Sequence, residues 1–145
     1  MQVEPREWCF AAVLKACDAK TRPAGLGPYT DDWWNDLNRA IRDFVIDQGL
    51  MLISRWYETF YDDKTRRARV RSAHLKQSHV VFSTYPEFDA IALWLVSCKP
   101  LDFGRCTESL QRCLKKNGAP ATLRSAWLAR LEFNGNGQAN FEASD

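Results

Sequence analysis

A segment rich in glycine and proline separates the first twenty residues from the rest of the chain. The nine residues 21–29, TRPAGLGPY, contain two prolines and two glycines. Proline lacks a backbone N–H and fixes φ, and glycine weakens both helices and strands, so we expect no regular element to run through this segment. The elements before and after it therefore have to form separately and pack together afterwards.

Apolar residues recur at helical spacing in several segments. This spacing predicts five helices, over residues 6–19, 31–47, 83–98, 106–118 and 120–133. Thr30 is a suitable N-cap for the second helix, because its hydroxyl can accept a hydrogen bond from the first turn. The run Ile91–Val96 is apolar on all sides, which indicates that the helix over 83–98 is central and buried.

Three other segments have the character of strands. Residues 50–61 satisfy both a helical period and strand alternation, and their aromatic and β-branched side chains favour a strand over a helix. Residues 66–72 alternate strictly, and residues 79–84 form the third predicted strand. The sequence thus predicts an α+β fold with about five helices and a small antiparallel three-stranded sheet. A nearly all-α fold is the alternative.

Length and composition fit one domain. The chain has 145 residues, of which 46% are hydrophobic, with six Trp and eight Phe to build a core. We expect a single globular domain over 1–133 and a flexible C-terminal tail over 134–145. The N-terminus lacks the basic start and long apolar core of a secretory signal, and no window approaches a membrane span. We therefore expect a cytoplasmic protein with no membrane association, whose five cysteines are reduced.

The main charge feature is a basic run in the middle of the chain. Six cationic residues and no acid lie between Lys64 and Lys76, although the net charge of the chain is only +2. Alternate residues of a strand point the same way, about 6.6–6.8 Å apart, close to the spacing of successive phosphates in a nucleic acid. The candidate anion-binding site comprises Lys64, Arg66, Arg67, Arg69, Arg71 and Lys76, with Arg55, Tyr57 and Tyr61 on the neighbouring strand. Arginine also keeps the solvent face of a sheet soluble, which is the structural explanation of the same pattern.

Two adjacent tryptophans stand near the start of the helix predicted over 31–47. One helix cannot bury Trp33 and Trp34 against the same neighbour, so one of them is a candidate anchor for a partner protein. The candidate protein interface comprises Trp33, Tyr29 and Asp36.

The sequence predicts no catalytic residue, metal or cofactor. His74 and His79 would lie on opposite faces of one strand, or about 140° apart on a helix, so a shared metal site is not expected. Cys106 and Cys113 share a helical face with Leu110, as buried thiols do, and no cysteine pair has zinc-ligand spacing.

The sequence favours a small non-enzymatic protein that binds nucleic-acid phosphates or another anionic macromolecular surface through its basic strand. An alternative is a protein–protein interaction module, such as an inhibitor, an immunity-type protein or a small subunit of a macromolecular assembly. A second alternative is a small hydrolase or transferase that uses His74 or His79. The expected partner is a nucleic acid or a macromolecular protein complex, and the oligomeric state stays open.

Overall fold

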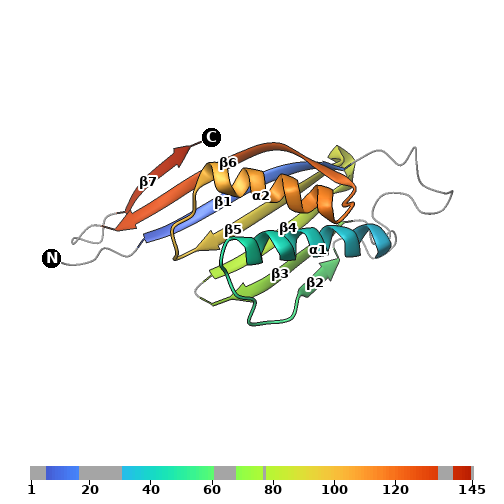
Figure 1. The fold of residues 1–145 in the computed structure, drawn as a ribbon, viewed down its shortest axis with the longest axis horizontal. Helices are drawn as coiled ribbons and strands as arrows, with labels where there is room; N and C mark the ends of the chain where they lie inside the picture. Colours follow the sequence, from blue (N-terminus) through green and yellow to red (C-terminus); the bar gives the residue numbers. More distant parts are fainter. Residues whose placement is uncertain (1–5, 17–30, 61–67, 77, 134–138, 145) are drawn as a thin grey trace.

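Two helices and a seven-stranded sheet form two layers in the computed structural model, which describes residues 6–16, 31–60, 68–76, 78–133 and 139–144 (Figure 1). The strands are β1 (Arg6–Ala16), β2 (Tyr57–Phe60), β3 (Arg69–Leu75), β4 (Ser78–Tyr85), β5 (Ala90–Ser97), β6 (Ala121–Phe133) and β7 (Ala139–Ser144). The helices are α1 (Asp31–Asp47) and α2 (Phe103–Lys116), and a short 3-10 turn, η2 (Pro86–Phe88), links β4 to β5.

The first strand lies inside the sheet. The strand order is β2-β3-β4-β5-β1-β6-β7, and every pair of neighbours is antiparallel. The chain therefore places β1, forms the meander β2 to β5 on one side of it, and crosses through α2 to add β6 on its other side. Because β1 pairs with both β5 and β6, its hydrogen bonds depend on residues far along the chain.

Both helices cover the same face of the sheet, where they lie side by side (Figure 1). Alternate strand residues point toward them and are fully buried, among them Phe10, Phe82 and Leu93. The apolar side of α1 meets these residues with Trp33, Trp34, Leu37, Ile41 and Phe44, each 0% exposed. No described helix covers the opposite face, which we call the open face. Among the described residues, no helix has the length and apolar character needed to cross a membrane.

The ends of α2 follow from its terminal residues. The Asp102 carboxylate accepts a hydrogen bond of 2.9 Å from the backbone N–H of Arg105 and caps the first turn. Lys115 and Lys116 lie in the last turn, where the helix dipole favours cations. Gly118 follows with φ +60, a conformation that glycine adopts without strain.

Part of the predicted secondary structure is confirmed. The helix predicted over 31–47 is α1, and the helix predicted over 106–118 corresponds to α2. The strands predicted over 66–72 and 79–84 correspond to β3 and β4, whereas only Tyr57–Phe60 of the segment 50–61 forms a strand. Residues 139–144, within the segment expected to be a flexible tail, form β7 and pair with β6.

The predicted fold is wrong in both its helices and its sheet. The segments 6–19, 83–98 and 120–133 contain strands β1, β5 and β6 instead of helices. In β1, Phe10, Ala12 and Leu14 are buried under the helices, while the residues that alternate with them, Cys9, Ala11 and Val13, are also uncharged. A strand that is apolar on both faces gives no alternation of polar and apolar residues, so a helical spacing fits it equally well. The same holds for β5.

The misassignment of β6 has a further cause. Its pairing with β1 shifts register between Val13 and Leu14, so that Leu123 lies opposite Leu14 and Leu128 opposite Phe10. Both leucines therefore pack against the core under the helices, although they are five residues apart in the sequence. A bulge of this kind interrupts the two-residue period of a strand and leaves a spacing that a helix also satisfies.

Phe44→Ala should lower the free energy of unfolding by about 3–5 kcal/mol, because Phe44 is 0% exposed and its ring centroid lies 5.7 Å from that of Phe10. Ile46→Ala is the control on the same helix, because Ile46 is 50% exposed, and it should change this free energy by less than about 0.5 kcal/mol. Urea denaturation followed by circular dichroism measures both values. Equal losses for the two variants would contradict the proposed packing of α1.

Candidate functional site

The described arginines of the basic run point toward the helices. Arg69 and Arg71 share a face of β3, as the alternation predicts, but this is the face that α1 covers. Arg69 is only 4% exposed, and its guanidinium carbon lies 5.2 Å from the ring centroid of Trp34 and 4.8 Å from that of Phe60. The guanidinium of Arg71 lies 5.1 Å from the Trp34 ring. Both cations therefore stack on aromatic rings within the fold.

Glu58 of β2 pairs with both arginines. Its Oε1 accepts a hydrogen bond from Arg69 Nη1 at 3.3 Å and another from Arg71 Nε at 3.1 Å. The backbone N–H of Arg69 donates to Thr84 Oγ1 at 2.9 Å. This network joins β2, β3 and β4 at the edge of the sheet, and it favours the structural explanation of the basic strand. Binding of anions by these residues stays a prediction.

The other predicted anion-binding residues do not gather on one described surface. Arg55 and Lys76 are exposed, whereas Lys64, Arg66, Arg67 and Tyr61 lie outside the described residues. Tyr57 is 55% exposed and lies on the open face, where its ring is 6.1 Å from that of His74. Tyr57 thus lies on the opposite face of the sheet from Arg69 and Arg71.

Both adjacent tryptophans of α1 are buried. Trp34 packs on Phe82 with ring centroids 5.5 Å apart, and Trp33 lies edge-on to Trp34 at 5.7 Å. The expectation that one of them is exposed is therefore wrong, and Trp33 is not a surface anchor. Each tryptophan is buried partly against the other. Asp36 pairs with Arg39 on the same helix, and Tyr29 lies outside the described residues.

The two histidines are cross-strand partners. The chain reverses after Leu75, so that His74 on β3 stands opposite His79 on β4, and both are exposed on the open face. The prediction that they lie on opposite faces is wrong because it assumes one continuous strand. Nevertheless, in the part of the chain that the structure describes, no group of three or more His, Cys, Asp or Glu residues could hold a metal ion.

Polar and nucleophilic side chains gather at the end of the sheet where β4 begins and β5 ends. Ser78 stands opposite Ser97, and Cys98 follows directly. The spacing of strands, about 4.8 Å, and the rise per residue, about 3.4 Å, place the Cα atoms of Ser78 and Cys98 about 6 Å apart. Lys99 joins this end to the turn that follows α1, because its Nζ donates to the carbonyl oxygen of Gly49 at 3.3 Å.

The hydroxyl of Ser78 is buried and has no hydrogen-bond partner among the described residues. Ser78 alternates with Val80 and Phe82, so its side chain points to the face that the helices cover. Ser97 differs, because its Oγ accepts a hydrogen bond of 2.9 Å from the backbone N–H of Lys99. An unpaired buried hydroxyl costs about 1–3 kcal/mol, and such a group calls for an explanation such as a catalytic role.

Cys98 is the exposed thiol among the four described cysteines. Burial raises the pKa of the Cys106 thiol to about 12, with a further contribution from the nearby Asp102 carboxylate. Burial also raises the pKa of Cys9 and of Cys113. A raised pKa keeps a thiol protonated at neutral pH, where it is a poor nucleophile. Cys98 is thus the described cysteine that is accessible for chemistry.

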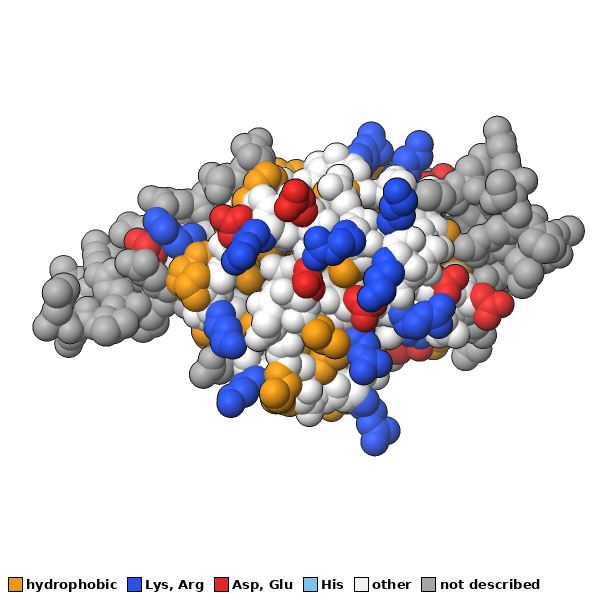
Figure 2. Space-filling model, in the orientation of Figure 1, with side chains coloured by type: hydrophobic (Ala, Val, Ile, Leu, Met, Phe, Trp, Pro, Cys, Tyr) orange, Lys and Arg blue, Asp and Glu red, His pale blue; other side chains and the backbone are white. Residues whose placement is uncertain are grey.

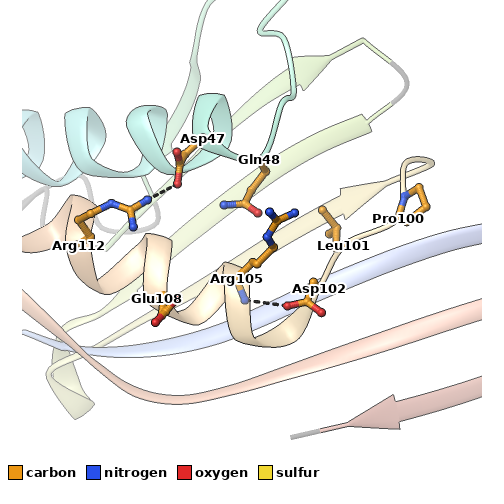
Figure 3. A pocket seen from close by; sticks show the side chains of 8 residues that line it. All are labelled: Asp47, Gln48, Pro100, Leu101, Asp102, Arg105, Glu108 and Arg112. Atoms are coloured by element: carbon orange, nitrogen blue, oxygen red, sulfur yellow. Dashed lines mark hydrogen bonds and ion pairs between the residues drawn. The ribbon is translucent and has the colours of Figure 1, made fainter.

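A cavity of about 660 Å³ lies at the same end of the molecule, between the C-terminus of α1 and the start of α2 (Figure 3). It is lined by Asp47, Gln48, Pro100, Leu101, Asp102, Arg105, Glu108 and Arg112. Asp47 is held in place, because its Oδ2 accepts hydrogen bonds of 2.5 Å from Ser109 and from Arg112. Arg105 forms no ion pair with a described residue, and Figure 3 shows its guanidinium between Gln48 and Leu101.

The pair Ser78 and Cys98 is absent from the sequence-based candidates. The two residues are twenty positions apart, and only the pairing of β4 with β5, in which Ser78 stands opposite Ser97, brings them to one end of the sheet. The available signal was the turn at Pro86–Asp89 between two segments of similar length, which indicates a hairpin. Because the apolar pattern predicts a helix over residues 83–98, this hairpin is not among the predicted elements.

No protein-family model and no curated protein matches the chain. Among solved structures, the chain is similar to the adenosylmethionine decarboxylase from Aquifex aeolicus VF5, with a TM-score of 0.52 and 14% sequence identity. The similarity covers 87% of this chain and 90% of that chain. At this identity it shows the fold alone, and the chain has an adenosylmethionine decarboxylase-like fold.

Glu58→Gln should lower the free energy of unfolding by about 1–3 kcal/mol, because it removes the carboxylate charge of Glu58 from the buried guanidinium of Arg69. The loss stays below that of a fully buried pair because the Glu58 side chain is 28% exposed. Glu87→Gln is the control, since Glu87 is exposed in η2. If Glu58→Gln changes the free energy of unfolding by less than about 0.5 kcal/mol in urea denaturation, the prediction is wrong, because solvent then already screens the ion pair.

Iodoacetamide at pH 7.5 should modify Cys98 in the folded protein much faster than Cys106 or Cys113. The raised pKa of Cys106 should keep its rate low as the pH rises to 9, where an ordinary thiol, with a pKa of about 8.5, is mostly ionised. Peptide mass spectrometry after timed quenching measures each site, and urea-unfolded protein gives the reference rates. Modification of Cys106 as fast as Cys98 would contradict the described burial.

Proposed function

We propose that this protein is an enzyme of the decarboxylase type that acts on adenosylmethionine or a closely related amino acid, with Ser78 and Cys98 in its active site. The observation that carries the proposal is the buried hydroxyl of Ser78, which has no hydrogen-bond partner among the described residues, at the same end of the sheet as the exposed thiol of Cys98. The fold supports the choice of substrate only by analogy, because one fold can serve many activities.

Decarboxylation sets a chemical requirement on the site. Loss of CO₂ from an α-amino acid leaves an electron pair on the α-carbon, and a carbonyl group that condenses with the substrate amine supplies the electron sink. No encoded side chain is an aldehyde or a ketone. The sink therefore has to be a bound cofactor or a carbonyl group formed within the chain. In this proposal, the Ser78 hydroxyl and the Cys98 thiol, which lie at one end of the sheet, are the groups that act beside this carbonyl.

Each of the two residues has a distinct proposed role. Cys98 follows the last residue of β5 and is exposed, so its thiol can act as the general acid that returns a proton to the α-carbon. Ser78 is the first residue of β4, and its hydroxyl is free of described partners, so it can donate a hydrogen bond to a reacting group or act as a nucleophile.

The neighbouring cavity, which neither Ser78 nor Cys98 lines, has the size and charge to hold part of such a substrate. Its volume of about 660 Å³ lies within the range of about 300–1,000 Å³ typical of ligand pockets. Adenosylmethionine carries a carboxylate, an ammonium and a sulfonium group. The guanidinium of Arg105 suits the carboxylate, and the acids Asp102 and Glu108 suit the cationic groups. Nucleic-acid binding through the basic strand has less support, because Arg69 and Arg71 pair with Glu58.

The purified full chain should release labelled CO₂ from adenosylmethionine labelled in its carboxyl group. Ser78→Ala and Cys98→Ala should each lower the rate by at least about 100-fold, the usual effect of removing a group that transfers a proton or bonds to the substrate. Ser125→Ala and Cys9→Ala are the matched controls, because both residues are half-buried on the open face, and they should retain the rate.

Two outcomes of this experiment and one further assay separate the parts of the proposal. Absence of CO₂ release together with no thermal shift at about 1 mM adenosylmethionine would show that the substrate is wrong. Release that Ser78→Ala and Cys98→Ala leave unchanged would show that the active site lies elsewhere. Reduction with cyanoborohydride in the presence of substrate, followed by intact mass measurement, should reveal the substrate attached to the chain if the carbonyl group belongs to the chain.

A further inference from the structure

Strands β3 and β4 form a hairpin that carries both histidines of the chain (Figure 1). His74 on β3 stands opposite His79 on β4, and the next pair, Leu75 with Ser78, adjoins the turn. Both imidazoles are exposed on the open face. Because the chain has no other histidine, every imidazole that it can offer to a ligand stands at this one place.

The backbone hydrogen bonds of His74 show which kind of antiparallel pair the two histidines form. The N–H of His74 donates to Ser54 Oγ at 2.8 Å, and its carbonyl oxygen accepts a hydrogen bond from the N–H of Ile53 at 3.0 Å. Both backbone groups therefore point away from β4, so His74 and His79 are a non-hydrogen-bonded pair. In such a pair the Cα atoms are about 4.5 Å apart, and the side chains are closer than in a hydrogen-bonded pair.

Two imidazoles at this separation can bind the same metal ion. The Cβ atoms of directly opposed residues lie about 4.5–5.5 Å apart. Metal–nitrogen bonds of about 2.0–2.1 Å in a tetrahedral site require the two ligating nitrogens to be about 3.3 Å apart, which the rings reach by rotation about their side-chain bonds. Opposed histidines on two strands are thus the counterpart of histidines four residues apart on a helix, which bind zinc.

The surroundings of the pair leave both rings available to a ligand. Within the described part of the chain, no hydrogen bond or ion pair occupies either imidazole. Tyr57 packs edge-on against His74, with ring centroids 6.1 Å apart, and limits the rotation of that imidazole. The neighbouring open-face positions on β3, β4 and β5 are Ser72, Val81 and Val96, and none of these three residues carries a charge.

The described acids of the helix layer offer no comparable site. Figure 2 shows Asp and Glu side chains interspersed with Lys and Arg across the outer surface of this layer. Asp47 pairs with Arg112 at 2.5 Å, and Lys116 Nζ lies 3.9 Å from Asp43 Oδ2. These cations already compensate the carboxylates, so the histidine pair is the better metal-binding position among the described residues.

We propose that His74 and His79 bind one divalent transition-metal ion of the class that imidazole nitrogen prefers, Ni²⁺, Cu²⁺ or Zn²⁺. Water fills the other coordination positions, because no group of three or more described His, Cys, Asp or Glu residues could hold the ion. The ion links β3 to β4 beside their turn, where β4 begins with Ser78. Because the pair forms only when the two strands pair, binding stabilises the folded state. The site does not depend on the proposed enzymatic function.

Isothermal titration of the untagged full chain with Ni²⁺ should show one binding site per chain. His74→Ala and His79→Ala should each weaken binding at least about 10-fold, because a single imidazole lacks the second bond that the pair provides. Ser72→Ala, on the same face of β3, is the matched control and should keep the affinity. Cys98→Ser should also keep it, which separates the pair from the exposed thiol. Circular dichroism checks that each variant is folded.

Thermal unfolding gives a second measurement of the same site. Ni²⁺ at about 100 times its Kd should raise the Tm of the wild-type chain by about 5–10 °C, because the ion binds the folded hairpin. The Ser72→Ala variant should show the same rise, and His74→Ala should show none at that Ni²⁺ concentration. Mg²⁺, which prefers oxygen ligands, should leave the Tm of all three proteins unchanged.

Either of two results would overturn the proposal. One is Ni²⁺ binding that both histidine variants leave unchanged, which would place the ion on other side chains. The other is a wild-type chain that shows no saturable binding below about 1 mM Ni²⁺, which would mean adventitious coordination by exposed side chains only.

Discussion

The rest of the structure depends on the packing of α1 and α2 against a single face of the sheet. The aromatic contacts between Phe44 and Phe10 and between Trp34 and Phe82 join the two layers. Because the helices cover one face only, neighbouring residues of each strand meet different surroundings. This constraint decides which arginines of β3 are buried, and it leaves Trp94 and Trp127 exposed on the other side.

The same constraint changes the meaning of the charge pattern. A stripe of arginines on an outer face would meet phosphates or solvent, but Arg69 and Arg71 lie on the inner face. There, a carboxylate and aromatic rings compensate for the removal of their charges from water, which would otherwise be costly. The sequence correctly predicts that Arg69 and Arg71 share one face of β3. Their structural role follows because this is the face that the helices cover.

The elements that the sequence predicts correctly are those with an unambiguous period. Helix α1 has a polar side and an apolar side, and α2 has a cap at Asp102 and two lysines in its last turn, so local signals define both. Strand β1 has no such signal, since its residues are uncharged on both faces from Trp8 to Leu14. The candidate site could not be predicted for a related reason. Ser78 and Cys98 come to the same end of the sheet only if β4 and β5 form a hairpin, and the apolar run in β5 fits a buried helix equally well.

By itself the sequence determined the two helices, the hairpin of β3 and β4, and the alternation of charge along β3, because these depend on neighbours within a few residues. Only the tertiary structure decided that β1 lies inside the sheet, that Ser78 stands opposite Ser97 at the end of the sheet where Cys98 follows, that His74 faces His79, and which face of the sheet the helices cover. The physical reason is that strand pairing joins residues far apart in the chain, and a strand with two apolar faces does not specify its partners locally.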